Sequence, residues 1–352
     1  RNIVINGAMQ VAQRSTEVAA LGANGTVYAT VDRFAVSSGG PSAGRFTMSQ
    51  TADGPSGFRN CLKLDCTTPD TSIAAGENLI LEQRIEGQNL QQLKKGTADA
   101  EKFTISFYAK SNAERDIVLE IFEDENTRHV AKLFTIGTSW ARHSYTFPAD
   151  TTGDLDDDIG IGFYLNWWLH AGATYTTGTL PAVWANNSNA NRAAGTESFF
   201  ASDANNFFIT GVQMEVGSVA TPFEHRSFGE EYQLCQRYYQ ELTGSVDNSA
   251  LGDADQALFP MLAYNTTLGL GTVTFITPMR GLPAIGFSAV GHFLKSTAGR
   301  GDTVTGLALY DATTNATTRT AYINVTSSTS TAGGGLVATQ NTAARLNFDA
   351  EL

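Results

Sequence analysis

The stretch Phe103-Thr-Ile-Ser-Phe-Tyr-Ala-Lys110 alternates apolar and polar side chains, which places Phe103, Ile105 and Phe107 on one face of an extended chain. Similar segments follow at short intervals, at residues 117–123, 132–136, 141–147, 159–169 and 206–216. Gly, Asn, Ser and Asp residues separate them. Short strands joined by polar turns are typical of a β-sandwich, so we expect an all-β fold.

A different period marks residues 228–242. Apolar and aromatic side chains recur there at offsets of three and four, namely Tyr232, Cys235, Tyr238, Tyr239 and Leu242. Ser227 offers an N-cap, with Glu230 three residues later as in a capping box, and Gly244 offers a stop signal. We therefore predict an α-helix that links two domains.

The strand pattern returns after this helix, in a segment richer in Thr, Ala and Gly. This change of composition sets the expected domain boundaries. We predict a β-sandwich domain over residues 1–226, the linking helix over 227–243, and a smaller β-sandwich domain over 244–352.

Composition argues against several classes of protein. Hydrophobic residues make up 42% of the 352 residues and charged residues only 16%, the reverse of the balance that keeps a chain disordered. The net charge is −12, and no basic cluster exceeds Lys94-Lys95, so we expect no nucleic-acid partner and no anionic membrane surface. No apolar run approaches the ~20 residues that span a bilayer, so we expect no membrane insertion.

The three cysteines, Cys61, Cys66 and Cys235, are an odd number, which argues against a disulfide framework. The opening residues carry no apolar core of a secretory signal peptide. We therefore expect free, mostly buried thiols and synthesis in the cytoplasm.

The clearest candidate binding region is rich in aromatic and amide side chains. Aromatic rings stack on the C–H faces of sugars, and amides bind sugar hydroxyls. The candidate glycan contacts are Tyr175, Trp184, Trp168, Asn186 and Asn187. Tyr175 and Trp184 are the strongest of them, because neighbouring Gly and Pro residues place both in or beside loops. Adjacent Trp167 and Trp168 face opposite ways in a strand, and the alternative is that one or two of the tryptophans belong to the sandwich core.

An acidic stretch supplies a candidate calcium site at Asp154, Asp156 and Asp158, although its spacing is not that of an EF-hand. The alternative is a solvated loop between strands.

Residues 40–44 match the pattern G-x-S-x-G, but an apparent strand follows where a hydrolase needs a helix. We therefore expect no catalytic residues.

Several motifs look familiar when they are taken together. The chain opens with Asn2-Ile-Val-Ile-Asn-Gly-Ala-Met-Gln-Val-Ala-Gln-Arg14, and Asp32-Arg-Phe34 follows. The most specific motif is Thr210-Gly-Val-Gln-Met-Glu-Val-Gly-Ser-Val-Ala-Thr-Pro-Phe-Glu-His-Arg226, followed by Leu234-Cys-Gln-Arg-Tyr-Tyr239. These motifs resemble a family of bacteriophage tail-fibre-like virion proteins, whose N-terminal jelly roll is similar to carbohydrate-binding modules.

This resemblance implies a non-enzymatic structural protein of a tailed-phage virion, made in the host cytoplasm. The expected role is a tail fibre or fibre-like appendage that binds a host surface glycan as receptor. The expected partners are other virion proteins and further copies of the chain in a homotrimer. The alternatives are a capsid decoration or head-fibre protein with a mechanical role and, third, a tailspike glycosidase.

Overall fold

The computed structural model describes residues 2–40, 42–243, 256–263, 265, 267–297, 300–310, 317–327, 334–339 and 343–352. The chain divides into two compact units. The first contains residues 1–232 together with Leu352, and the second contains residues 233–351. The boundary between the two units therefore falls inside helix α2 (Phe228–Gln236).

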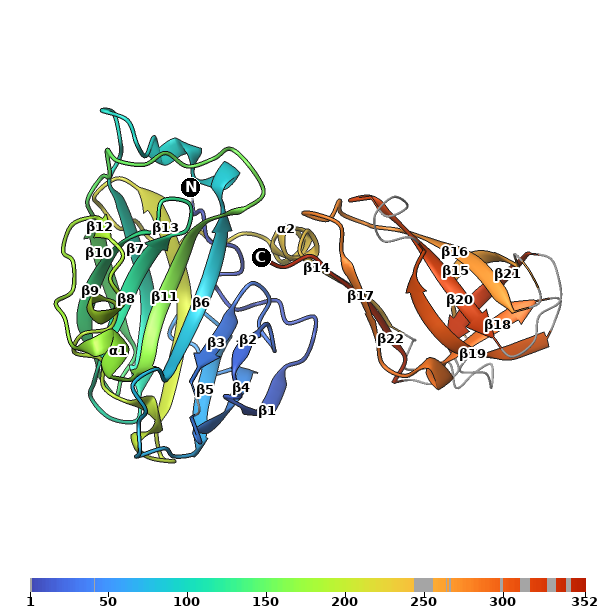
Figure 1. The fold of residues 1–352 in the computed structure, drawn as a ribbon, viewed down its shortest axis with the longest axis horizontal. Helices are drawn as coiled ribbons and strands as arrows, with labels where there is room; N and C mark the ends of the chain where they lie inside the picture. The colour runs from blue at the N-terminus through green and yellow to red at the C-terminus, as the bar shows by residue number, and fades with distance from the viewer. Residues whose placement is uncertain are drawn as a thin grey trace. The chain divides into compact units, whose positions relative to one another are not determined.

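The first unit is built from two antiparallel sheets (Figure 1). The order of the first sheet is β1 (Glu17–Leu21), β4 (Arg45–Thr51), β5 (Cys61–Thr68), β13 (Asn206–Val216), β7 (Phe103–Ser111) and β10 (Ala141–Phe147). The order of the second sheet is β12 (Ala185–Asn186), β9 (Arg128–Ile136), β8 (Arg115–Glu123), β11 (Ile161–Ala171), β6 (Asn78–Glu86), β3 (Ala35–Gly39) and β2 (Gly25–Val27).

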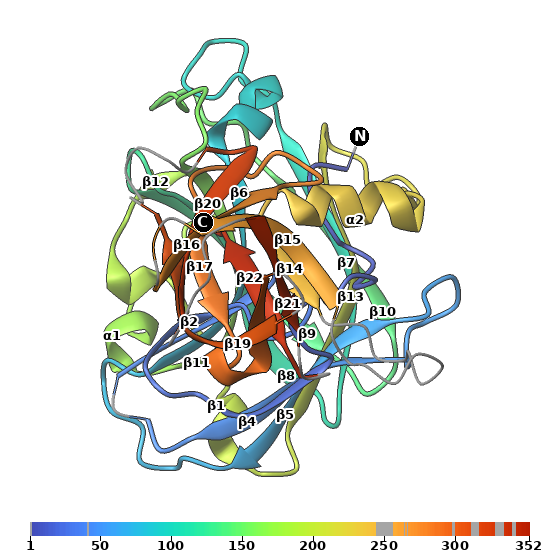
Figure 2. The same ribbon diagram turned by 90° about the vertical axis from the view of Figure 1, so that its right-hand side faces the viewer.

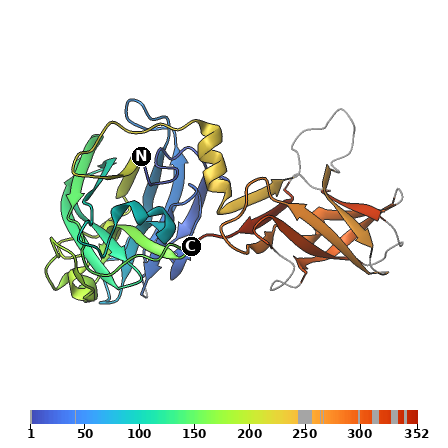
Figure 3. The same ribbon diagram turned by 90° about the horizontal axis from the view of Figure 1, so that it is seen from above.

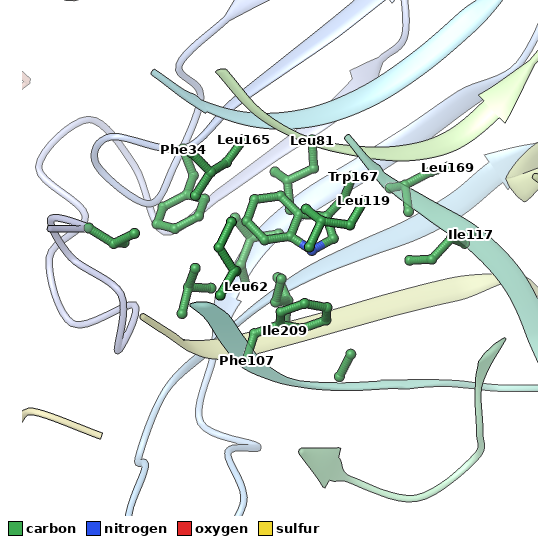
Figure 4. Packing of buried hydrophobic residues seen from close by; sticks show 14 of the residues in the cluster. Phe34, Leu62, Leu81, Phe107, Ile117, Leu119, Leu165, Trp167, Leu169 and Ile209 are labelled. Atoms are coloured by element: carbon green, nitrogen blue, oxygen red, sulfur yellow. The ribbon is translucent and has the colours of Figure 1, made fainter. Parts of the chain in front are cut away.

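The core of this unit lies between the two sheets. Trp167 of β11 is fully buried, and its ring lies 5.6 Å from that of Phe107 on β7 in an edge-to-face arrangement. Figure 4 shows both rings among aliphatic side chains from both layers. The alternation that predicted a strand at residues 103–110 therefore arises because every second side chain enters this core. The predicted all-β class and jelly-roll sandwich are confirmed.

The predicted linking helix is correct in its first half only. Ser227 caps α2, with its Oγ accepting from the backbone N–H of Glu230 at 3.2 Å, and the helix is drawn as a regular coil in Figures 2 and 3. The helix ends at Gln236, and β14 (Tyr239–Thr243) follows where the helix was predicted to continue. Strand β14 pairs with β22 (Arg345–Asp349), so backbone pairing with the far end of the chain replaces the last helical turn.

The second unit contains a closed barrel and a three-stranded sheet (Figure 1). The barrel order is β15 (Gln256–Ala263), β16 (Leu268–Thr274), β20 (Thr320–Ser327), β19 (Arg300–Leu309), β18 (Phe293–Thr297) and β21 (Gly334–Thr339). The sheet order is β14, β22 and β17 (Ala284–Phe287). The first twelve residues of the predicted second domain, 244–255, lie outside the described ranges.

This barrel corrects the prediction of a second, smaller sandwich. Two glycines of β16 explain how the sheet closes. A Cβ on Gly271 would lie 2.3 Å from the Phe259 ring, and one on Gly269 would lie 1.8 Å from the Met261 side chain. These glycines let the β15 side chains fill the space that a larger residue on β16 would occupy, and closure removes the exposed sheet edges.

Helical structure elsewhere is short. Helix α1 (Ala173–Thr176) has four residues, and 3₁₀ turns occupy Gly87–Asn89, Gln91–Leu93, Asn189–Asn191, Phe199–Ala201 and Val290–His292. Within the described ranges, none of the helices has the length and apolar character needed to cross a bilayer.

Candidate functional site

The candidate site lies on the outer face of the second sheet of the first unit. Phe163, Leu165 and Trp167 of β11 enter the core, so the residues between them face outward. Strand register aligns these outward residues in rows across β6, β11 and β8, namely Arg84–Tyr164–Phe122, Glu82–Asn166–Glu120 and Ile80–Trp168–Val118. A polar row thus lies between two rows that contain aromatic side chains.

A cavity of about 310 Å³ opens over these rows, and we call it the outer-sheet cleft. Its floor includes Glu82, Asn166 and Trp168. Residues 172–195 supply further walls, through Tyr175 and Arg192. This segment is attached to the sheet by a backbone hydrogen bond from Ala131 of β9 to the Pro181 carbonyl at 2.9 Å and by packing of Tyr175 on Trp168, whose ring centroids are 5.1 Å apart.

Glu120 anchors the cleft from below. Its side chain is fully buried, and its Oε2 accepts hydrogen bonds from the Trp168 indole at 2.9 Å and the Asn166 amide at 3.1 Å. Arg192 forms a two-pronged ion pair with the same carboxylate at 2.9 Å for each bond, and His129 Nδ1 lies 2.9 Å from it. Burial alone would raise the pKa of Glu120, but the Arg192 charge and these hydrogen bonds lower the pKa to about 2. Glu120 is therefore an ionised and fully occupied structural acceptor.

The two arginines of the cleft cover aromatic faces. The Arg192 guanidinium lies 4.7 Å from the Phe122 ring centroid and 5.0 Å from that of Trp168. The Arg84 guanidinium lies 5.3 Å from the Tyr164 centroid. These rings are therefore partly occupied by the protein's own cations, and a ligand meets a surface dominated by hydrogen-bonding groups.

Glu82 and Arg84 form an ion pair inside the cleft. Glu82 Oε1 accepts from Arg84 Nε at 2.9 Å and from Nη2 at 2.5 Å. Arg84 also donates to the main-chain carbonyl of Leu352. Burial raises the pKa of Glu82, and the charges of Arg84 and Arg192 oppose this effect. Glu82 is therefore the carboxylate of the cleft that takes up a proton more readily than an exposed glutamate does.

Two of the predicted glycan contacts line the cleft. Tyr175 forms part of its wall and Trp168 part of its floor. Trp168 is nevertheless fully buried, and its indole N–H donates a hydrogen bond to Glu120. Asn186 and Asn187 do not line it. Asn186 accepts from Arg128 at 3.0 Å, and the Asn187 backbone donates to Thr127 at 2.8 Å, so both belong to the β9–β12 edge.

Trp184 is a core residue, which corrects its assignment as a glycan contact. It is 9% exposed, and its ring centroid lies 5.5 Å from that of Phe163. Its indole N–H donates to the Pro148 carbonyl at 2.8 Å. Neighbouring prolines and glycines suggested a loop, but the chain returns to the sheet at Ala185 and turns this ring inward.

The ammonium group of Lys95 lies next to Trp184, at 5.6 Å from its ring. Lys95 is buried, and its Nζ lies 3.2 Å from Glu123 and 3.4 Å from Asp150. It also donates to the carbonyls of Thr152 and Gly153, at 3.1 Å and 2.6 Å. Four oxygens from two segments, Glu123 and the 150–153 loop, therefore surround one lysine charge, and we call them the Lys95 shell.

The predicted calcium site at Asp154, Asp156 and Asp158 is not formed. Among the described residues, no group of three or more His, Cys, Asp or Glu side chains is arranged to hold a metal ion. Asp158 instead accepts from the backbone of Gly160 at 2.8 Å, which makes a local turn. Sequence spacing did not reveal that the cation of this region is Lys95.

Sequence reasoning missed Glu82, Arg84 and Arg192. The strand signal for 159–169 was correct, but the apolar run by itself gave no indication of a polar row across its outer face. Charged residues at alternate positions of β6 were the available signal, because Glu82 and Arg84 interrupt the run Leu79, Ile80, Leu81. Arg192 carried no local signal, since its partner lies 72 residues away.

Comparisons with known proteins give structural similarity at low sequence identity. No family model and no curated protein matches the chain. Among solved structures, a CBM4 module aligns at 14% identity and TM-score 0.32, covering 60% of this chain and 97% of that one. The family 11 carbohydrate-binding module of Clostridium thermocellum aligns at 14% and 0.27, covering 58% and 98%.

The enzymatically active domain of tailspike protein 4 from bacteriophage CBA120 aligns at 14% identity and TM-score 0.30, covering 61% of this chain and 21% of that one. The solved structures to which this chain is similar thus include carbohydrate-binding modules and one phage tailspike domain. Membership of a tail-fibre family stays a prediction from the sequence motifs.

Proposed function

We propose that the first unit is a glycan-binding module and that the outer-sheet cleft is its binding site. The observation that carries this proposal is the cleft itself, a cavity of about 310 Å³ with a polar central row between aromatic rows. Small-molecule sites are typically concave, partly aromatic and equipped with a few fixed polar groups. A sugar presents hydroxyls to such polar groups and C–H faces to the half-exposed rings of Tyr164 and Tyr175.

The rigidity of the cleft supports this role. Asn166, Trp168 and Arg192 are each tied to Glu120, so the polar groups on the floor are positioned before a ligand arrives. Preorganised groups lose little conformational entropy on binding. The scaffold below them is the packed sandwich core, and the covering segment 172–195 is held by Arg192 and Tyr175.

We further propose that the protein is a non-enzymatic component of a tailed-phage virion, such as a fibre that contacts a host surface glycan. The support for this setting is the sequence resemblance carried by residues 2–14 and 210–226. A structural role in the capsid is the alternative, and labelled antibody on intact particles distinguishes the two locations.

Glycoside hydrolysis at this cleft is disfavoured by its carboxylates. A glycosidase needs one carboxyl group to donate a proton and a second to act as base or nucleophile. Glu120 has both oxygens engaged and a pKa of about 2, so it is neither a proton donor nor a free nucleophile. The other carboxylates of the cleft are Glu82 and Asp124, and Glu82 is engaged in its ion pair with Arg84.

A second arrangement, Ser198–His170–Glu77, has the residue types of a hydrolase triad. Ser198 Oγ lies 2.8 Å from His170 Nδ1, and Glu77 lies 3.3 Å from Nε2. His170 is fully buried, however, and its ring packs against Phe200 at 5.1 Å. Burial lowers the pKa of His170, and we assign the group a structural role in joining β11 to its neighbours.

A glycan array probed with the purified full-length chain tests the proposed function. We expect retention of at least one glycan, and at least tenfold weaker binding by Tyr175→Ala. Tyr108→Ala is the matched control, because Tyr108 is half-exposed on β7 of the other sheet and does not line the cleft. The proposal is contradicted if the chain binds no glycan on the array, or if Tyr175→Ala and Tyr108→Ala lose binding to the same extent. Release of shorter sugars from a bound polysaccharide would show an enzyme instead.

A further inference from the structure

The polar row of the outer-sheet cleft contains two acceptor oxygens to which none of the described residues donates a hydrogen bond. Asn166 donates its Nδ2 hydrogen to Glu120 at 3.1 Å, and because Glu120 is ionised, the amide nitrogen must face it. Asn166 Oδ1 is then turned away from Glu120. This oxygen is buried and has no hydrogen-bond partner within the part of the chain that the structure describes.

Glu82 supplies the second acceptor. It lies directly opposite Asn166 on the neighbouring strand, a relation that brings Cβ atoms to about 5 Å. Its Oε1 receives both hydrogen bonds from Arg84, whereas none of the described residues donates to its Oε2. Glu82 is only 4% exposed and Asn166 only 2%, so bulk water reaches this pair poorly.

Asn166 Oδ1 is an unpaired buried acceptor, which is costly, and Glu82 lines the cleft beside it, so the pair creates a requirement on the ligand. We propose that Glu82 and Asn166 determine the specificity of the cleft by requiring a hydrogen-bond donor, an unsubstituted hydroxyl or an amine, between Glu82 Oε2 and Asn166 Oδ1. This inference rests on the proposed glycan-binding function. A sugar whose corresponding oxygen is methylated brings only a third acceptor, so the site rejects it.

Protonation of Glu82 removes the requirement. A carboxylic O–H at Glu82 donates to Asn166 Oδ1 itself, and the donor of the ligand then loses its acceptors. The groups that face Glu82 are Arg84 on its own strand, Arg192 from the covering segment, Asn166 and Tyr164 on β11, and Glu120 and Asp124 from β8 and its end. Burial raises the pKa of Glu82, so affinity for the ligand falls as the pH falls through that raised pKa.

Glu82→Gln tests the assignment because it imitates the protonated state. The amide keeps an oxygen for Arg84 and offers an N–H to Asn166 Oδ1. We expect at least tenfold weaker glycan binding with a melting temperature equal to or above that of the wild type. Glu114→Gln is the matched control, since it makes the same chemical change at an exposed position that does not line the cleft, and it should keep wild-type binding within about threefold.

Calorimetric titrations use cellohexaose, its fully O-methylated counterpart and chitosan hexaose with the full-length chain. We expect the methylated sugar to bind at least tenfold more weakly than cellohexaose or chitosan hexaose, and the stronger of these two identifies a hydroxyl or an amine as the donor. The inference is overturned if the methylated and free sugars bind equally, if none of the three sugars binds, or if Glu82→Gln binds glycan as strongly as the wild type.

The melting temperature of Glu82→Gln needs no sugar and therefore separates the two proposals. If Glu82→Gln melts at or above the wild-type temperature while the wild type binds no glycan on the array, the result supports the acceptor pair and contradicts the proposed function. A melting temperature several degrees lower, beside an array that retains glycans, overturns the acceptor pair and leaves the proposed function standing.

Discussion

Single residues of the first unit are specialised by their surroundings, as its two cleft glutamates illustrate. Glu120 and Glu82 flank Asn166 on neighbouring strands, and both are buried. Five hydrogen bonds and ion-pair contacts stabilise the charge of Glu120, whereas Glu82 accepts two hydrogen bonds from Arg84 and is further favoured by the charge of Arg192. The pKa of Glu120 is therefore lowered and that of Glu82 is raised.

This difference predicts how stability depends on pH. The pKa of Glu120 is about 2 in the folded chain against 4.5 unperturbed, so its stabilising effect is present above pH ~4.5 and is lost as the pH falls toward 2. The linked loss is on the order of 3 kcal/mol. Urea unfolding at several pH values should show that Glu120→Gln is less stable at neutral pH and flatter across this window. Glu101→Gln, at an exposed ion pair with Lys94, is the control and should leave the curve unchanged.

Trp184 leads to a second prediction at this scale. Its ring fills the core beside Phe163, and its indole N–H satisfies Pro148. Trp184→Ala should therefore cost about 3–5 kcal/mol of unfolding free energy. Tyr175→Ala, at the half-exposed wall of the cleft, should cost far less. Chemical denaturation of both variants checks this contrast, and a fully stable Trp184→Ala protein would contradict the core assignment.

At the scale of elements, sequence patterns predicted strands well because one face of each strand is buried. The alternation at 103–110 identified β7, and the run at 159–169 identified β11. The end of α2 was beyond local prediction, because Tyr239 suits both a helical stripe and a strand. Its partner strand, β22, begins about a hundred residues later, so only tertiary pairing decides between the two.

The candidate site was predicted in part for the same reason. Tyr175 and Trp168 were found because aromatic residues near glycines are visible in a local window. The polar row Glu82–Asn166–Glu120 is assembled from three strands, and no single segment carries its pattern. Likewise, the oxygens of the Lys95 shell come from Glu123 and from the 150–153 loop, which the sequence does not place beside a lysine.

The Lys95 shell predicts how this loop is stabilised. Two carboxylates and two carbonyls surround an ammonium group that is 6% exposed. Removal of the charge leaves the buried Glu123 without its counter-ion, while Asp150 keeps its ion pair with Arg128, so Lys95→Met should cost about 3 kcal/mol or more. Lys94→Met is the matched control, because the Lys94 side chain is 54% exposed and its surface ion pair is worth little.

Calcium distinguishes a lysine shell from a metal site. In Lys95→Ala the four oxygens remain, and oxygen ligands of this kind suit Ca²⁺. We expect millimolar Ca²⁺ to raise the melting temperature of Lys95→Ala, because an ion that binds only the folded state stabilises it. The wild-type melting temperature should be the same in Ca²⁺ and in EGTA. A wild-type protein that melts earlier in EGTA would restore a natural calcium site.

At the scale of the whole molecule, the two units differ in what they present to solvent. The first unit carries the outer-sheet cleft, in which five charged groups lie close together, namely Glu82, Glu120, Asp124, Arg84 and Arg192. The barrel of the second unit carries exposed apolar side chains on its strands, with Leu262 68% exposed and Leu336 43% exposed. We propose that the first unit serves recognition through its cleft and that the second unit serves association through its barrel.

The apolar outer face of the barrel is the surface through which we expect the chain to form a homotrimer. Strand register places Leu262 opposite Leu270 and Leu336 opposite Pro260, and Tyr322, 41% exposed, lies opposite Thr272 on the next pair. Contiguous exposed apolar surface on a β-structure favours association, because burying it removes apolar area from water. We therefore expect this face to be covered by other copies of the chain.

Light scattering after size-exclusion chromatography checks this expectation on the full-length chain. The wild type should have about three times the 37.6 kDa mass of one chain at micromolar concentration. Leu262→Lys combined with Leu336→Lys should shift the mass toward a single chain, because charges on this face must be desolvated when copies associate. Val219→Lys is the control, since Val219 is 70% exposed but belongs to the first unit and not to the barrel. A wild-type monomer would contradict the trimer, and a trimer that tolerates both lysines would place the interface on another surface.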